Sequence, residues 1–280
     1  MQLVIKMKNI LEKIKTSDYF QIMMVGDSIT YGTGSNPRHA ENITDPDDEN
    51  TYTAFFARML SERLNDKTVV RYDGIYNGEN RNADGTIYIH EYKGPITVGE
   101  GKKGKITVVR SGIGGNTVAR LISRKDDFLG KVVEDKSADL FFIKSGINDS
   151  LYHIDGEGPK HAEPDEYGKN LETLINDVKA SNPNADIVLM TPTVNDEHTE
   201  EQWFGKSQLD PYAKKMKEVA AKYGLNIVDL HSLWMAHLDK NAANHGSGDW
   251  LTAREGDFCH PSPKGHEAIA KEMIKTLFGE

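Results

Sequence analysis

Five short runs of consecutive apolar residues recur along this 280-residue chain, at 21–26, 106–110, 139–144, 186–191 and 225–230. A strand covered on both faces is apolar at successive positions, because neither face meets water. Segments with helical spacing of apolar residues alternate with these runs, at 51–65, 116–130, 165–181, 209–223 and 264–278. Alternating strands and helices connect by right-handed crossovers into a parallel sheet with helices on both sides. We therefore predict a three-layer α/β/α fold, with ligands bound at the carboxyl ends of the strands.

One stretch interrupts the alternation. Residues 71–105 are rich in Gly, Asn, Asp and Lys, and within them 86–92 alternate between apolar and polar residues. Such a pattern indicates hairpins rather than a helix. No composition change elsewhere resembles a linker. We therefore expect a single domain over residues 1–280 that carries one β-rich insertion at about 71–105.

Composition narrows the class of partner and the compartment. Hydrophobic residues make up 38% of the chain, enough for a core, and the formal net charge is −9. An acidic protein is a poor binder of nucleic acid or anionic membrane, since both favour a basic surface. The single cysteine, Cys259, excludes an intrachain disulfide, and no apolar run approaches the ~20 residues of a membrane span. The first eight residues do not resemble a signal peptide, so we expect a cytoplasmic location, although a chain trimmed of its leader would look the same. The oligomeric state is not readable from the sequence.

A candidate nucleophile follows the first apolar run. Ser28 stands in the segment Gly26-Asp27-Ser28-Ile29-Thr30, where a parallel strand would end. A serine hydroxyl is a weak nucleophile and needs an adjacent base. The alternative is a turn serine that bonds its own backbone.

A candidate base lies near the other end of the chain. Asp257 and His260 are three residues apart, so a tight turn can place a carboxylate beside an imidazole. The carboxylate would fix the tautomer of His260 and stabilise the imidazolium that forms on proton transfer. The alternative is structural, with Asp257 as a helix cap and His260 as a helix-entry residue.

Two further segments offer donors for an oxyanion hole. The glycine-rich segment 112–117 follows the second apolar run, and Asn148 follows the third. A backbone N–H in the former and the side-chain amide in the latter are donors of the required kind, each worth ~3–4 kcal/mol in the transition state. The alternatives are a tight strand-to-helix turn and an ordinary turn residue.

These four segments, in this order, resemble the SGNH hydrolase superfamily, also called GDSL esterases and lipases, over about residues 21–278. The resemblance implies a flavodoxin-like five-stranded parallel sheet, with Ser28 as nucleophile and His260 as base, oriented by Asp257. It also implies an oxyanion hole formed by the backbone N–H groups of Ser28 and Gly115 and by the side chain of Asn148. The second segment departs from the family pattern: Ser111 stands where Asn is frequent, and Asn116 where Asp is common. Its neighbouring glycines leave Gly114 as the alternative donor, and we assign Asp27 and Gly114 to the substrate-binding surface.

Competing motifs are incomplete. Residues 99–105 match the first seven positions of a phosphate-binding P-loop, but Ile106 stands where Ser or Thr is needed and an apolar strand follows. The ten histidines show no metal-ligand spacing. We therefore predict neither a metal nor a cofactor.

The sequence thus predicts a serine ester hydrolase that forms an acyl-enzyme. We expect it to remove short acyl groups, in particular acetyl, from a carbohydrate such as an oligosaccharide, because the chain is acidic and the insertion carries four tyrosines: Tyr72, Tyr76, Tyr88 and Tyr92. The alternative is that these tyrosines pack against one another across the strands of a hairpin and do not bind substrate, and the sequence is equally compatible with it. The alternative functions are a lysophospholipase or thioesterase and a catalytically silent carbohydrate-binding module. Two roles are open for the insertion. It either shapes the substrate cleft, or it is a surface segment without a catalytic role or an oligomer contact.

Overall fold

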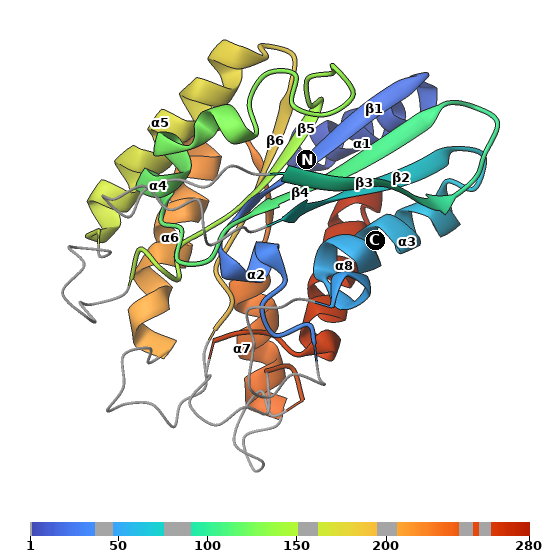
Figure 1. Cartoon of the computed structure of the whole chain (residues 1–280). Helices are drawn as coiled ribbons and strands as arrows, with labels where there is room; N and C mark the ends of the chain where they lie inside the picture. Colours follow the sequence, from blue (N-terminus) through green and yellow to red (C-terminus); the bar gives the residue numbers. More distant parts are fainter. Residues whose placement is uncertain are drawn as a thin grey trace.

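A computed structural model describes residues 2–36, 47–75, 91–150, 162–194, 206–240, 249–251 and 259–280 (Figure 1). Within these ranges, seven strands form one sheet in the order β3-β2-β4-β1-β5-β6-β7. Their bounds are β1 Tyr19–Gly26, β2 Thr68–Ile75, β3 Glu91–Gly99, β4 Lys105–Gly112, β5 Leu140–Lys144, β6 Asp186–Met190 and β7 Asn226–Val228. All neighbouring strands are parallel except β3, which is antiparallel to β2.

The predicted fold class is confirmed, with one correction to the number of strands. All five predicted apolar runs are strands, and they form the consecutive part β4-β1-β5-β6-β7 of the sheet. The sheet has seven strands rather than five, because β2 and β3 extend it beyond β4.

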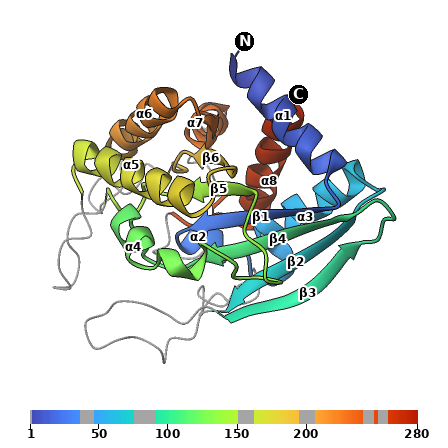
Figure 2. The same ribbon diagram turned by 90° about the horizontal axis from the view of Figure 1, so that it is seen from above.

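Helices cover both faces of the sheet (Figure 2). On one side lie α1 Gln2–Thr16, α3 Tyr52–Arg63 and α8 Pro263–Phe278, and on the other lie α4 Val118–Ser123, α5 Pro164–Ser181 and α6 Lys206–Tyr223. Two other helices follow strand ends: α2 Ser28–Tyr31 after β1 and α7 Leu230–Lys240 after β7. Single 3₁₀ turns occur at Asp48–Asn50 and Lys125–Asp127. In the described part of the chain, no helix combines the length and apolar character needed to cross a membrane.

Strand β1 shows why the runs are apolar at consecutive positions. Ile22 and Met24 belong to the core cluster that α1, α3 and α8 complete. Met23 and Val25 belong to the cluster on the opposite face, against α4 and α5. Because successive side chains point to opposite faces, a strand between two helical layers buries every residue.

The insertion takes part in the sheet. Strand β2 runs parallel to β4, with Thr68 opposite Lys105 and Tyr72 opposite Val109. Strand β3 then returns antiparallel, with Ile75 opposite Glu91. The chain between β3 and β4 crosses the amino end of β2, where Gly104 accepts the N–H of Thr68. Ile75 and Glu91 therefore stand at the carboxyl edge of the sheet, and the chain reaches that edge through the sheet itself rather than by folding back over it.

Two of the four insertion tyrosines pack against the protein. Tyr72 is buried and donates its hydroxyl to Glu134, and the hydroxyl of Tyr92 donates to the Asp127 carbonyl. For these two, packing is the better description than a role in substrate binding. Tyr76 and Tyr88 lie outside the described residues.

Candidate active site

The turn after β1 presents Ser28 at the first position of α2 (Figure 1). A Cβ on Gly26 would lie 2.1 Å from the Thr30 hydroxyl, and a Cβ on Gly112 would lie 2.1 Å from the Tyr31 nitrogen. Both positions therefore require glycine, so that the helix can turn back tightly against β1 and β4. As the first helical residue, Ser28 has a backbone N–H that the helix itself leaves without an acceptor.

Asp27 is the N-cap of α2. Its Oδ1 accepts the Ile29 N–H over 2.9 Å, and its Oδ2 lies 3.3 Å from the ammonium of Lys144. The residue is 1% exposed. We predicted Asp27 in the substrate-binding surface, and this placement argues against that role, because both carboxylate oxygens contact the protein interior.

The chain directly after His260 is anchored to Trp250 and Leu251. Pro261 bridges to Leu251, and the Ser262 N–H donates to the Trp250 carbonyl over 2.8 Å. Ser262 also begins α8, because its hydroxyl accepts the Gly265 N–H as an N-cap. His260 therefore stands on a short, fixed segment at the start of a helix.

Ser28 and His260 meet across 232 residues of sequence. The Nε2 atom of His260 lies 2.9 Å from the Ser28 hydroxyl oxygen, and both residues are half-buried. With Nε2 unprotonated, the hydroxyl donates to it, which is the arrangement that lets an imidazole remove the serine proton during attack. The Sγ atom of Cys259 lies 3.6 Å from His260 Nδ1. Asp257, predicted as the orienter of His260, lies outside the described residues.

The predicted oxyanion segments stand at the same edge of the sheet. The N–H of Ile113 donates to the Gly26 carbonyl, which ties the glycine-rich loop to the end of β1. Gly115 has φ +71°, a left-handed conformation that favours glycine. Gly114 has open space around its Cα. The Asn148 side chain donates from Nδ2 to the Asn116 carbonyl over 3.1 Å and is buried, so the second and third segments are in direct contact.

Arg124 organises this region and was not predicted. Its Nη2 donates to the carbonyls of Gly26 and Ser111, over 3.3 and 2.9 Å, and its Nε donates to Asn116 Oδ1 over 2.6 Å. Burial lowers the pKa of Arg124 to about 10, so it remains charged at neutral pH, and Asp127 lies 3.6 Å away. One buried guanidinium thus joins the ends of β1 and β4 to the glycine-rich loop. An isolated arginine eight residues after Asn116 carries no motif by which sequence reasoning could find it.

Asp149 connects the loop after β5 to α4. Its carboxylate accepts the N–H of Val118 over 2.9 Å and that of Gly146 over 3.2 Å. Full burial raises the pKa of Asp149 to about 7, against the lowering effect of these two donors. The side chain next to Asn148 is therefore a structural tie between the second and third segments.

His266 fixes the start of α3 beneath the site. Its Nδ1 accepts the Tyr52 N–H over 3.2 Å, so the ring proton is on Nε2, which lies 3.2 Å from the Thr33 carbonyl. Burial lowers the pKa of His266 to about 3. The neutral ring therefore joins α8, α3 and the chain after α2.

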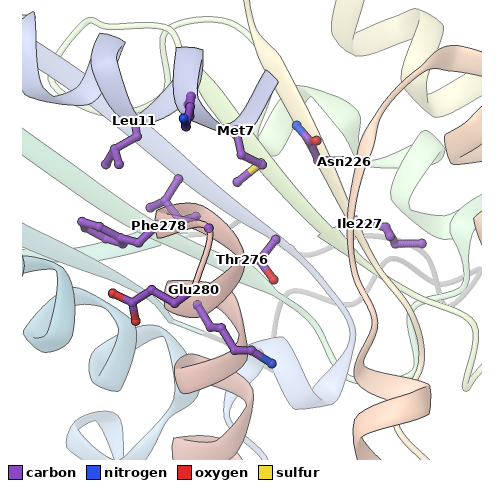
Figure 3. Close-up of a pocket in the computed structure, with 11 residues that line it drawn as sticks. Met7, Leu11, Asn226, Ile227, Thr276, Phe278 and Glu280 are labelled. Atoms are coloured by element: carbon purple, nitrogen blue, oxygen red, sulfur yellow. The ribbon is translucent and has the colours of Figure 1, made fainter. Parts of the chain in front are cut away.

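A separate cavity of 360 Å³ lies at the opposite edge of the sheet (Figure 3). It is bounded by Met7 and Leu11 of α1, Asn226 at the amino end of β7, and Phe278 at the end of α8. Ser28 follows the carboxyl end of β1, so this cavity is not part of the candidate active site.

The profile of the GDSL-like Lipase/Acylhydrolase family matches residues 99–268, more than half of the chain. The protein therefore belongs to the GDSL-like lipase and acylhydrolase family, a class of carboxylic ester hydrolases. No curated protein is significantly similar in sequence.

Solved structures share the fold at low sequence identity. A lipase/acylhydrolase from Enterococcus faecalis superposes with a TM-score of 0.59 at 18% identity, over 93% of this chain and 96% of that one. An acetyl xylan esterase gives 0.58 at 18% identity, over 91% and 98%. An acetylxylan esterase from Geobacillus stearothermophilus gives 0.57 at 22% identity, over 94% and 96%. At these identities the likeness concerns the fold.

Proposed function

We propose that this protein hydrolyses esters through an acyl-enzyme on Ser28, with His260 as the general base. The observation that carries the proposal is the 2.9 Å contact between Ser28 Oγ and His260 Nε2, on segments that the fold anchors separately. Ser28 attacks the ester carbonyl as His260 accepts its proton. His260 then protonates the leaving alcohol, and water releases the acyl group by the same route.

The oxyanion is held by the N–H groups of Ser28 and Gly115 and by the amide of Asn148. The amide has two hydrogens. One is donated to the Asn116 carbonyl, which orients the group, and the other is the donor we assign to the oxyanion. In this proposal Asp257 orients His260, and Gly114 lines the bound substrate.

The proposed substrate is a short acyl ester, in particular an acetyl ester, on a carbohydrate. Support comes from the acidic chain and from the similarity to acetylxylan esterases. A lipid acyl hydrolase is the alternative within the same chemistry, whereas family membership argues against a silent binding module. We propose no nucleic-acid or membrane partner and a cytoplasmic location.

Two measurements test the nucleophile and the acyl group. Ser28→Ala should lose nearly all hydrolysis of 4-nitrophenyl acetate while unfolding as the wild type does, and a serine-directed phosphonate should label the wild type alone. Labelling of another residue would reassign the nucleophile. In a series of aryl esters from acetyl to dodecanoyl, kcat/KM should fall with chain length, and an increase toward long chains would favour the lipid substrate.

The insertion is proposed to contribute to the carbohydrate site. Strand β2 ends at Ile75 and β3 begins at Glu91, both at the carboxyl edge of the sheet. Ser28 lies at the same edge. Replacing residues 77–89 by a short Gly/Ser linker keeps β2 and β3. Hydrolysis of 4-nitrophenyl acetate should then persist, while acetate release from an acetylated xylo-oligosaccharide should fall. Equal activity on both substrates would assign the segment to the surface or to an oligomer contact.

A further inference from the structure

Lys144, the last residue of β5, is a fully buried lysine beneath the candidate active site. It is 0% exposed. Its neighbour two positions earlier, Phe142, belongs to the core cluster against α3 and α8, so the alternation of the strand directs Lys144 to that same face. A lysine in such surroundings must lose its charge or be paired. Its Nζ lies 3.3 Å from Oδ2 of Asp27, which is itself buried.

Stability alone does not explain this pair. Removing two charges from water costs about as much as their attraction returns, and buried pairs replaced by apolar residues often leave a protein equally or more stable. The location of the pair is more informative. Asp27 is the residue before Ser28, and its second oxygen accepts the N–H of Ile29, the residue after Ser28. The carboxylate therefore bridges β5 and the turn that carries the nucleophile.

The turn depends on this bridge because α2 is short. A helix of four residues has almost no stability of its own, so its orientation is set by its cap and by packing. With the Ile29 N–H held by Asp27, the turn is fixed in the orientation that aims the Ser28 hydroxyl at His260.

We propose that Lys144 is a positioning residue for ester hydrolysis: its ammonium holds the Asp27 carboxylate in place, and through Asp27 it fixes the turn that presents Ser28 to His260. The inference rests on the proposed roles of Ser28 and His260. It adds a residue that touches neither the substrate nor the reacting atoms.

The charge of the pair also bears on the base. Lys144, Arg110 and His260 act electrostatically on His266. Asp27 acts in the same way on Tyr52, whose ring stacks on that of His266. Without Lys144, the Asp27 carboxylate would be a negative charge that has lost this partner, on the residue before Ser28, whose hydroxyl contacts His260. It would stabilise the imidazolium, so the base would become available only at higher pH.

The test compares Lys144→Met with the double variant Asp27→Asn/Lys144→Met. Methionine keeps the volume of the lysine stem and removes the charge. In Lys144→Met, kcat for 4-nitrophenyl acetate should fall about 30-fold or more, with KM changed less than about threefold, because the nucleophile is misplaced. The midpoint of the kcat/KM pH profile should rise by about one unit.

In the double variant, the side-chain amide introduced at position 27 still caps α2 and carries no charge. The midpoint should therefore return to that of the wild type, whereas kcat should stay low, because the contact between β5 and the turn is still missing.

Lys67 provides a matched control. It is also buried, but it donates to the Ser17 carbonyl at the amino edge of the sheet. Lys67→Met should lose stability in urea and keep the wild-type kcat and pH midpoint. Should Lys144→Met not fold, Asp27→Asn leaves the ammonium unpaired, and its pH midpoint should then move below that of the wild type.

Three outcomes would overturn the proposal. These are a wild-type kcat and midpoint in Lys144→Met, a wild-type kcat in the double variant or a midpoint there that stays at that of the single variant, or an unshifted midpoint in Asp27→Asn. The rate of phosphonate labelling at Ser28 separates this failure from failure of the proposed function. If Ser28 is not the labelled residue, the nucleophile is wrong; if it is labelled at the wild-type rate in Lys144→Met, only the role of Lys144 is wrong.

Discussion

The side-chain amide of Asn148 donates to the backbone carbonyl of Asn116, so the loop after β5 and the glycine-rich loop after β4 hold each other in place. This contact orients the amide before any substrate arrives. Preorganised donors of this kind stabilise a developing oxyanion because they need no reorganisation during the reaction. The contact thus has a measurable consequence for catalysis.

Asn148→Ala should lower kcat about 100-fold or more, because it removes one of the proposed oxyanion donors. The KM for a small aryl ester should change little, since the donor acts mainly in the transition state. Steady-state kinetics with 4-nitrophenyl acetate measures both constants. A large rise in KM with unchanged kcat would instead assign Asn148 to ground-state binding.

Activity should rise with pH as His260 loses its proton, with an apparent pKa of about 6.5 before the site perturbs it. His260→Ala should abolish the rise together with the activity. Asp257→Asn should cost less, because in the proposed mechanism Asp257 orients the base and does not itself accept the serine proton. The pH profile of kcat/KM checks the first expectation. A loss in Asp257→Asn as large as that in His260→Ala would make the carboxylate indispensable.

Arg124→Met should destabilise the protein by about 3 kcal/mol or more, because Asp127 loses its buried partner and several acceptors are left unsatisfied. Urea denaturation followed by tryptophan fluorescence measures the change. Arg63→Met is the control, since Arg63 forms an exposed ion pair with Glu280. Exposed pairs of this kind add little to stability, and equal losses in the two variants would contradict the role given to Arg124.

His266 should make the fold sensitive to acid. Its pKa is about 3 in the folded protein and ~6.5 when unfolded. Between these values the unfolded chain binds the extra proton, so stability is fully present above pH 6.5 and falls as the pH is lowered toward 3, by up to ~1.4 kcal/mol per unit. His266→Gln keeps an acceptor for the Tyr52 N–H and cannot take up the proton. Its free energy of unfolding between pH 6.5 and 4 should therefore vary less than that of the wild type, and an equally steep variation would locate the acid sensitivity elsewhere.

Strands β2 and β3 were not predicted as part of the central sheet, and helix α1 was not predicted, each for a specific reason. Strand β2 carries Arg71 and Asp73, which are buried and form an ion pair over 3.0 Å. These two charged residues interrupt the apolar pattern of the strand, and the sequence does not show that they pair with each other. Strand β3 lies at the edge of the sheet and contains Gly94 and Pro95, which are frequent at edges and bulges. Helix α1 does show helical spacing at Met7, Ile10, Leu11 and Ile14, but we considered that segment only as a leader.

By itself, the sequence determined the layers of the fold and the residue types of a serine hydrolase. Burial on both faces makes a strand apolar at consecutive positions, and the turns at strand ends require particular residues, so both can be recognised as local patterns. The five core strands and the segments around Ser28, Gly115, Asn148 and His260 are such local patterns. The resemblance implied the pairing of Ser28 with His260, and the tertiary structure gave its geometry. Only the tertiary structure decided which other distant groups meet: Arg124 with the ends of two strands, and Lys144 with Asp27. These contacts join residues that are far apart in the chain, and the charge of a buried lysine or arginine depends on a partner that no local pattern specifies.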